Sequence, residues 1–134
     1  TTRYTHDAGV LASIERFVAL NSAIEVDLTG QVNAEQAAGS YVGAVGGAAD
    51  FLRGAARSRG GLPIVALPSL AGRRSRIVSQ LSGPVSTSRA DAGLIVTEHG
   101  VADLRGQPLS KRIRRMIDIA APQFRAALEQ EANT

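Results

Sequence analysis

Residues 39–51 read Gly-Ser-Tyr-Val-Gly-Ala-Val-Gly-Gly-Ala-Ala-Asp-Phe, with four glycines within nine residues and a helical pattern directly behind them. Glycine costs conformational entropy on folding, so this density indicates tight turns or bare N–H groups that face a ligand. The first N–H groups of the following helix favour an anion. The spacing of Gly43, Gly46 and Gly47 matches neither a P-loop nor a complete dinucleotide fingerprint. A ligand cradle and a flexible connecting loop both remain open at this point.

Length and composition predict one globular domain over residues 1–134. A chain of this size buries roughly two thirds of its unfolded surface, and 44% of its residues are hydrophobic. No apolar run approaches the ~18 residues of a membrane span, and the N-terminus lacks a signal-peptide pattern, so we expect a cytoplasmic protein with no membrane partner. With no cysteine and only His6 and His99, no metal site is expected.

Basic residues are almost all arginine, since Lys111 is the one lysine among 15. Arginine suits phosphate and carboxylate ligands. Two clusters, at 73–76 and 111–115, could bind nucleic acid, but aromatic residues make up only 4% of the chain and no stacking platform is visible. The second cluster alternates with apolar residues at helical spacing, as on a solvated helix face. We therefore expect no nucleic-acid partner.

The N-terminal half predicts a short helix capped by Thr5 or Asp7, and then a hairpin. Its first strand runs from Phe17 to Leu28, with a bulge near Ser22, and residues 31–33 return after a turn at 29–30. Glu25 and Asp27 then lie either on a solvent-facing edge or, with Asn21, beside the glycine loop.

The C-terminal half alternates apolar strands with helices. Residues 48–57 predict a helix, 62–67 and 92–97 predict buried strands, and 85 begins an extended piece. A short helical turn at 101–106 and helices at 109–119 and 123–131 follow. The predicted fold class is α/β, a small mixed sheet with flanking helices.

Glu98 and His99 end the second apolar strand. A carboxylate and an imidazole at the end of a buried strand suggest a functional site. The alternative is a structural glutamate that accepts backbone N–H bonds.

Five motifs follow in order along the chain: Asn-Ser-Ala-Ile-Glu-Val-Asp-Leu-Thr-Gly-Gln-Val-Asn at 21–33, Val-Gly-Gly-Ala-Ala-Asp-Phe at 45–51, Ser-Arg-Ile-Val at 75–78, Ser-Thr-Ser-Arg-Ala-Asp at 86–91, and Val-Thr-Glu-His-Gly-Val-Ala-Asp-Leu-Arg-Gly at 96–106. Together they resemble the C-terminal domain of the acetyl-CoA hydrolase/transferase family, which includes 4-hydroxybutyrate, acetate and succinate CoA-transferases. The resemblance runs from about Tyr4 to Leu128. It implies the C-terminal half of the CoA-transferase (NagB/RpiA-like) fold.

The resemblance implies a family I CoA-transferase or an acetyl-CoA hydrolase, in which a glutamate forms an acyl anhydride and then a glutamyl-CoA thioester. In the family that glutamate lies upstream of the matched stretch. We therefore expect the C-terminal domain of a longer chain with a missing N-terminal domain, inactive alone and homo-oligomeric when complete. The implied partners are acyl-CoA and small carboxylates, with the coenzyme A thioester as substrate and no permanently bound cofactor.

The resemblance implies catalytic roles for Gly47, whose N–H would point into an oxyanion hole, and for Glu98, which would help place nucleophile and substrate. The residues implied to bind CoA are Asn21, Ala23, Gly43, Gly46 and Gly47. His6 falls where related enzymes carry an asparagine, and Arg73 and Arg74 are either contacts for CoA phosphates or part of a solvated loop.

The chain departs from the family pattern at Ala48, His99 and Ser88, where glutamine, an aromatic residue and proline are frequent. These departures bear on the acyl substrate rather than the fold. The competing functional class is a noncatalytic α/β module that binds a small ligand or a partner. It would lack transfer activity in any context.

Overall fold

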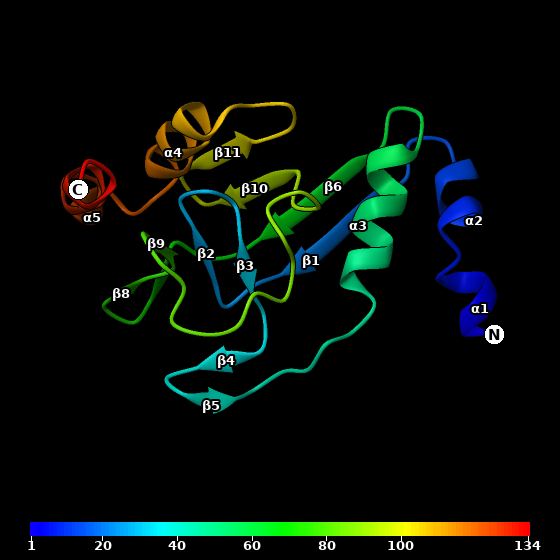
Figure 1. The fold of residues 1–134 in the computed structure, drawn as a ribbon, viewed down its shortest axis with the longest axis horizontal. Helices are drawn as coiled ribbons and strands as arrows, with labels where there is room; N and C mark the ends of the chain where they lie inside the picture. The colour runs from blue at the N-terminus through cyan, green and yellow to red at the C-terminus, as the bar shows by residue number, and fades with distance from the viewer.

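A four-stranded mixed sheet forms the centre of the molecule, in a computed structural model that describes residues 1–134. Its strand order is β1-β6-β10-β11, in which β1, β6 and β10 are parallel and β11 is antiparallel to β10. The strands are β1 (Val18–Ser22), β6 (Leu62–Ala66), β10 (Leu94–Thr97) and β11 (Gly100–Asp103). Figure 1 shows β1, β6 and β10 pointing the same way, which confirms the predicted α/β class.

Five helices flank the strands. They are α1 (Thr2–Thr5), α2 (Ala8–Ser13), α3 (Ala48–Arg57), α4 (Leu109–Asp118) and α5 (Pro122–Ala132). Helix α3 packs against β1 and β6, α2 packs on α3, and α4 packs against β11. Asp7 accepts a hydrogen bond from the Val10 N–H and is the side-chain cap of α2, as one of the two predicted caps.

A second, three-stranded sheet lies beside the carboxyl ends of the parallel strands (Figure 1). In it β2 (Glu25–Asp27) pairs with β3 (Val32–Asn33) in antiparallel fashion and with β9 (Ile77–Val78) in parallel. Two small hairpins complete the strands: β4 (Gln36–Ala37) with β5 (Ser40–Tyr41), and β7 (Leu70–Ala71) with β8 (Arg74–Ser75).

The predicted hairpin of residues 17–33 is therefore only half right. The turn at Thr29-Gly30 and the return strand are present, with Gly30 at a φ of 98°. The long first strand is wrong, because the chain leaves the central sheet after Ser22 and enters the second sheet at Glu25. The parity slip near Ser22 marks this change of sheet, not a bulge.

Glu25 and Asp27 are buried, with exposed fractions of 8% and 4%, so the prediction of a solvent-facing edge is wrong. Asp27 accepts hydrogen bonds from the backbone N–H groups of Thr29 and Gln31 and so fixes the β2–β3 turn. Glu25 accepts hydrogen bonds from Asn33 Nδ2 at 2.9 Å and from the Ser82 N–H at 2.6 Å. Both carboxylates are satisfied inside the protein, as buried charges must be.

Two further local predictions are corrected. Residues 101–106 begin as strand β11 rather than as a helical turn, because pairing with β10 satisfies their backbone groups. Val85 starts no strand; the one extended pairing nearby is an isolated bridge between Val32 and Thr87.

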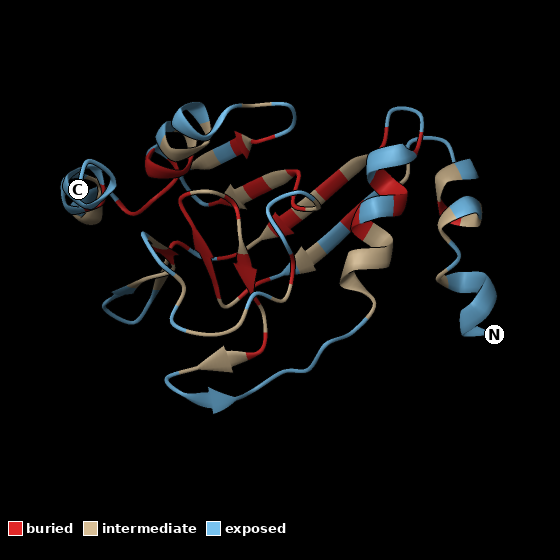
Figure 2. Cartoon of the chain, viewed as in Figure 1, coloured by how far each residue is buried: buried red, intermediate tan, exposed pale blue.

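The core lies between one face of the central sheet, helices α3 and α4, and the second sheet. Its fully buried members include Leu52 of α3, Ile95 of β10 and Met116 of α4. Figure 2 shows buried segments in the strands at the middle of the molecule, whereas α1 and most of α5 are exposed. None of the helices has the length and apolar character needed to cross a bilayer.

Candidate functional site

The carboxyl ends of β1, β6 and β10 meet at one edge of the sheet, where ligands bind in open α/β folds. Asn21 pairs with Val65, and Val65 pairs with Ile95, so β6 separates β1 from β10. At the usual strand spacing, Asn21 and Ile95 lie about 10 Å apart. Glu98 follows the end of β10. The glycine loop follows the end of β1 after the chain has passed through strands β2 to β5.

The glycine loop joins β5 to α3 and leaves a row of backbone donors free. Val42 and Gly43 donate their N–H groups to the Glu35 carbonyl at 2.8 and 3.1 Å. The N–H groups of residues 44–47 donate no hydrogen bond in the structure. Unpaired N–H groups beside a helix N-terminus are a ready anion site.

The glycines of this loop differ in what they require. A Cβ on Gly43 would meet the Ala34 carbonyl oxygen at 2.5 Å, so Gly43 serves close backbone packing. A Cβ on Gly46 would meet nothing within 4 Å. Gly46 therefore borders open space, while Gly43 shapes the loop.

Gly47 lies at the N-cap of α3 and faces His6. A Cβ on Gly47 would come within 2.5 Å of His6 Cε1. His6 Nδ1 lies 3.5 Å from an Asp50 carboxylate oxygen, and its ring packs edge-on against Phe51 with ring centroids 4.9 Å apart. These contacts bring a partly exposed imidazole beside the Gly47 backbone, and a role for His6 near a site stays a prediction.

Asn21 borders a small cavity of about 70 Å³ beneath the loop, together with Gly46 and Ser86. Its side-chain amide makes no hydrogen bond within the protein. Ala23 differs from Asn21, because it is 7% exposed and belongs to the core. The structure thus places Asn21 at the cavity beside the glycine loop and places Ala23 in the hydrophobic core.

Ser69 anchors Glu98 at the end of β10. The Ser69 N–H donates to the two carboxylate oxygens of Glu98 at 2.9 and 3.2 Å, and the Ser69 hydroxyl also donates to Glu98. These hydrogen bonds, from the hydroxyl first and the backbone second, lower the pKa of Glu98 from its ordinary 4.5 to about 2. The side chain is 51% exposed, so an ionised, fixed carboxylate faces outward.

The connection that carries Glu98 is itself well held. Glu98 and His99 join β10 to β11, where Thr97 pairs with Gly100. Thr97 donates its hydroxyl hydrogen bond to the Ile119 carbonyl at 2.6 Å and accepts the His99 N–H at 3.1 Å. Glu98 lines a shallow pocket with Ala66, Leu67, Pro68, Val96 and Thr97. Both interpretations of Glu98 drawn from the sequence thus apply to its contacts: it accepts a backbone N–H and it borders a pocket.

The structure brings the predicted residues into two groups on one sheet edge. Asn21, Gly46 and Gly47 gather at the N-terminus of α3, and Glu98 stands with Ser69 across β6. No hydrogen bond joins the groups. A ligand that contacted both would span the edge of the sheet.

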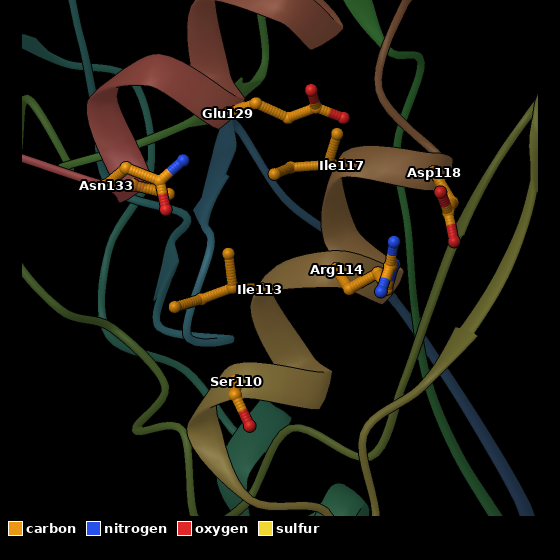
Figure 3. A pocket seen from close by; sticks show the side chains of 8 residues that line it. Ser110, Ile113, Arg114, Ile117, Asp118, Glu129 and Asn133 are labelled. Atoms are coloured by element: carbon orange, nitrogen blue, oxygen red, sulfur yellow. The ribbon is translucent and has the colours of Figure 1, made fainter.

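Other predicted or hollow regions lie apart from these groups. Arg73 and Arg74 sit exposed in the β7–β8 hairpin, and their side chains make no hydrogen bond. A groove between α4 and α5 is lined by polar residues such as Arg114, Asp118 and Glu129 (Figure 3). Arg112 donates to the carbonyls of Arg89, Gln107 and Thr29, so part of the second basic cluster holds loops together.

Sequence reasoning missed Ser69. It lies 29 positions before Glu98, and it lies outside the motif at 96–106 that contains Glu98. One signal was available: Ser69 follows a buried strand, and adjacent parallel strands bring their carboxyl ends to the same edge.

Comparison with known proteins supplies a family. Residues 1–132 match the model of the acetyl-CoA hydrolase/transferase C-terminal domain. The chain is 42% identical to the 4-hydroxybutyrate coenzyme A transferase of Clostridium kluyveri in an alignment of length 132 that covers 96% of this chain and 31% of that protein. It is 43% identical to the succinyl-CoA:acetate/propanoyl-CoA:succinate CoA transferase of Fasciola hepatica over 92% of this chain and 27% of that protein.

Solved structures agree with the match. The crystal structure of RipA from Yersinia pestis superposes with a TM-score of 0.87 at 39% identity, covering 97% of this chain and 28% of that one. The chain therefore spans about 30% of the length of the relatives it resembles.

Proposed function

We propose, because the chain belongs to the acetyl-CoA hydrolase/transferase C-terminal domain family, that it forms the oxyanion side of an acyl-CoA site in a longer CoA-transferase or acyl-CoA hydrolase. The observation that carries this proposal is the set of free N–H groups at residues 44–47, on the sheet edge that also bears Glu98. The substrates are an acyl-CoA thioester and a small carboxylate or water.

The proposed reaction uses a glutamate that lies outside these 134 residues. Its carboxylate attacks the thioester carbonyl and expels the CoA thiolate, which leaves an acyl-glutamyl anhydride. The thiolate then attacks the glutamyl carbonyl, releases the first carboxylate and forms a glutamyl-CoA thioester. An acceptor carboxylate completes transfer, whereas water completes hydrolysis.

The proposed role of Gly47 is to donate its N–H to the oxygen of the reacting carbonyl as negative charge develops there. Its N–H has no partner in the protein, and the dipole of α3 favours negative charge at this end. Removing one such donor from an acyl-transfer site costs about 3 kcal/mol of transition-state stabilisation.

The proposed role of Glu98 is electrostatic and steric rather than acidic. With a pKa of about 2, it is ionised at neutral pH and has no proton to donate. Held by Ser69, it is a fixed anion and hydrogen-bond acceptor at the border of the pocket. It orients hydrogen-bond donors that belong to the substrate or lie next to the nucleophilic glutamate.

A matched pair of variants at Gly47 tests the proposal in the complete protein. Gly47→Pro removes the N–H at a φ of −81°, which proline tolerates, and Gly47→Ala adds a comparable Cβ while keeping the N–H. The Cβ of either variant meets His6, so the difference in activity between the two variants reports the loss of the Gly47 N–H donor.

We expect kcat for CoA transfer from acetyl-CoA to small carboxylates to fall about 10²–10³-fold in Gly47→Pro and distinctly less in Gly47→Ala. Equal activity in the two variants would refute the oxyanion role. A complete protein that neither binds acyl-CoA nor transfers or hydrolyses it would instead support the noncatalytic binding module.

A further inference from the structure

Arg76 joins strand β8 to strand β9, within the Ser-Arg-Ile-Val motif at 75–78. Among the buried side-chain nitrogen and oxygen atoms of residues 1–134, only Arg76 Nε has no hydrogen-bond partner. Arg76 Nη1 makes one long hydrogen bond, of 3.5 Å, to the Ala23 carbonyl, and Nη2 makes none. Because buried donors in proteins are almost always paired, this guanidinium indicates a partner that these residues do not supply.

Arg76 also lacks a carboxylate partner. The ion pairs of the structure involve other cations, namely Arg53, Arg59, Arg105 and the two histidines. Glu25, on the neighbouring strand β2, is held instead by Asn33 and Ser82. A half-buried cation without a counter-ion is costly, because burial weakens its hydration. The missing partner of Arg76 is therefore best supplied by an anion.

The hairpin of β7 and β8 places Arg76 beside Ser69. Leu70 pairs with Ser75, and one step farther from the turn the Arg76 N–H donates to the Ser69 carbonyl at 2.8 Å. Residues opposite each other in an antiparallel pair direct their side chains to the same face, with Cβ atoms about 5 Å apart. The Arg76 side chain therefore leaves the hairpin on the face from which Ser69 holds Glu98.

This position lies between the two groups of candidate site residues. Ala23, whose carbonyl contacts Arg76, comes two positions after Asn21 of the first group. Ser69, the neighbour of Arg76 across the hairpin, anchors Glu98 of the second group. A ligand that spans the sheet edge from one group to the other would therefore pass the guanidinium.

The free atoms of Arg76 are those that bind carboxylates elsewhere in this protein. Nε and Nη2 of Arg53 donate to the two carboxylate oxygens of Asp91, and the same atoms of Arg105 donate to Asp103, at 2.8–3.0 Å. Two parallel N–H groups on one edge of a guanidinium match a carboxylate in this way. In Arg76 this edge has no partner.

We propose that Arg76 binds a carboxylate group of the acid that exchanges CoA. The inference rests on the proposed function for the identity of the ligand and adds a residue that recognises it. Nε is shielded from solvent, so binding requires a rotation of the Arg76 side chain that turns this edge outward. Glu98 is ionised at neutral pH and repels a second carboxylate, and the positive charge of Arg76 offsets that repulsion.

A phosphate of CoA is the competing anion. Arg76 lies beside Ser69 and Glu98, at the sheet edge where the proposed function places the reacting carbonyl. In CoA the long pantetheine arm separates the thioester from the phosphates. The position of Arg76 therefore favours the acid as its ligand.

Variants of the complete protein test the proposal. Arg76→Gln removes the charge, and Arg76→Lys keeps the charge but loses the paired donors. Arg59→Gln makes the same change of charge at a side chain that is 91% exposed, and it is the matched control. With propanoyl-CoA as CoA donor, kcat/KM is measured for acetate and for succinate, and the Kd of CoA is measured separately by calorimetry.

We expect Arg76→Gln to lower kcat/KM for the acid about 10–100-fold, as loss of a charged hydrogen-bonded pair does, and Arg76→Lys to lower it by less. The Kd of CoA should stay within about twofold, and Arg59→Gln should change neither quantity. A fall for both acids assigns Arg76 to the reacting carboxylate, and a fall for succinate alone assigns it to the second carboxylate of a dicarboxylic acid. Unchanged kcat/KM for both acids would overturn the proposal. So would a weaker Kd of CoA, because the ligand would then be a phosphate.

Saturation-transfer NMR with succinate makes the test independent of turnover. Succinate binding that weakens in Arg76→Gln but not in Arg59→Gln would support the site even if Gly47→Pro and Gly47→Ala had equal activity. Failure of the oxyanion proposal is therefore distinct from failure here. Equal succinate binding in Arg76→Gln and Arg59→Gln would overturn the carboxylate site.

Melting curves cover the case in which Arg76→Gln disturbs folding. The folded Arg76→Lys variant then carries the test, with reduced kcat/KM for the acid as the expected result. Unchanged kcat/KM in Arg76→Lys, together with a large loss of Tm in Arg76→Gln, would make Arg76 a structural residue and overturn the proposal.

Discussion

At the scale of single residues, Glu98 is defined by its partner Ser69. The Ser69 hydroxyl and N–H both donate to the carboxylate and stabilise its charged form. Because the folded pKa lies below the unfolded value, Glu98 contributes stability above about pH 4.5, and this contribution is lost as pH falls from 4.5 towards 2. The carboxylate is half exposed, so solvent screens its contribution to stability.

We expect carboxyl carbon NMR to give Glu98 a titration midpoint near 2 and Ser69→Ala to raise that midpoint towards 4.5. Ser110→Ala, in the α4–α5 groove, is the matched control and should leave the midpoint of Glu98 unchanged. A midpoint that does not move in Ser69→Ala would show that the Ser69 hydroxyl is not a cause, because this variant keeps the backbone N–H.

Glu25 is a structural carboxylate. It accepts hydrogen bonds from Asn33, Ser82 and Gly83 and so ties the loop at 82–83 to the second sheet. We expect Glu25→Ala to lower the free energy of unfolding by about 3 kcal/mol, because buried donors lose their acceptor. The exposed Glu131→Ala should change it by less than about 0.5 kcal/mol. Urea denaturation of both variants measures the difference, and equal midpoints would contradict this role.

At the scale of elements, the packing of α2 on α3 depends on Gly54. A Cβ there would come within 2.5 Å of Leu11 Cβ, close to the α2 backbone, so the contact cannot be relieved by a rotamer change. Replacing glycine with alanine in a helix interior normally raises the free energy of unfolding by up to about 1 kcal/mol. Overpacking costs about 1–3 kcal/mol and outweighs that gain.

We therefore expect Gly54→Ala to lower the free energy of unfolding by about 1 kcal/mol in urea denaturation. Ala56→Gly, at an exposed position on the same helix, reports the propensity effect alone and should cost up to about 1 kcal/mol. A Gly54→Ala variant more stable than the original protein would mean that α2 shifts away from the added Cβ with no loss of packing energy.

Elements with strong local patterns were predictable, and those decided by distant pairing were not. Helix α3 and strands β6 and β10 follow the sequence because their apolar periods are clear. The split between β1 and β2 escaped prediction, since β1 pairs with β6 through residues 44 positions apart, such as Val18 and Leu62. Residues 101–106 contain the helix formers Ala102, Leu104 and Arg105, yet the pairing of residues 100–103 with β10 outweighs this weak propensity.

The candidate site divides in the same way. The glycine loop and Glu98 came from motifs that resemble a family, because each motif is local in sequence. Ser69 escaped because its link to Glu98 exists only where two strands end side by side. Ala23 is implied to bind CoA by its place in a motif, and this stays a prediction; its 7% exposure follows the change of sheet after Ser22, which the motif did not reveal.

At the scale of the whole molecule, the candidate site offers free backbone N–H groups and a fixed anion but no suitable nucleophile. Glu98 has a pKa of about 2 and accepts hydrogen bonds from both the N–H and the hydroxyl of Ser69, and a carboxylate stabilised in this way is a poor nucleophile. Glu25 and Glu35 are each 8% exposed and occupied by internal hydrogen bonds. The proposed function therefore assigns the covalent step to a carboxylate from elsewhere in the longer protein.

We expect the complete protein, incubated with acetyl-CoA and digested, to yield a CoA-modified peptide that lies outside these 134 residues. Hydroxylamine cleaves an acyl thioester, so treatment before digestion should remove the modification and serves as the control. The same incubation with the 134-residue chain alone should give no modified peptide. A CoA adduct on Glu98 in either sample would contradict the assignment, because it would make the residue anchored by Ser69 the nucleophile itself.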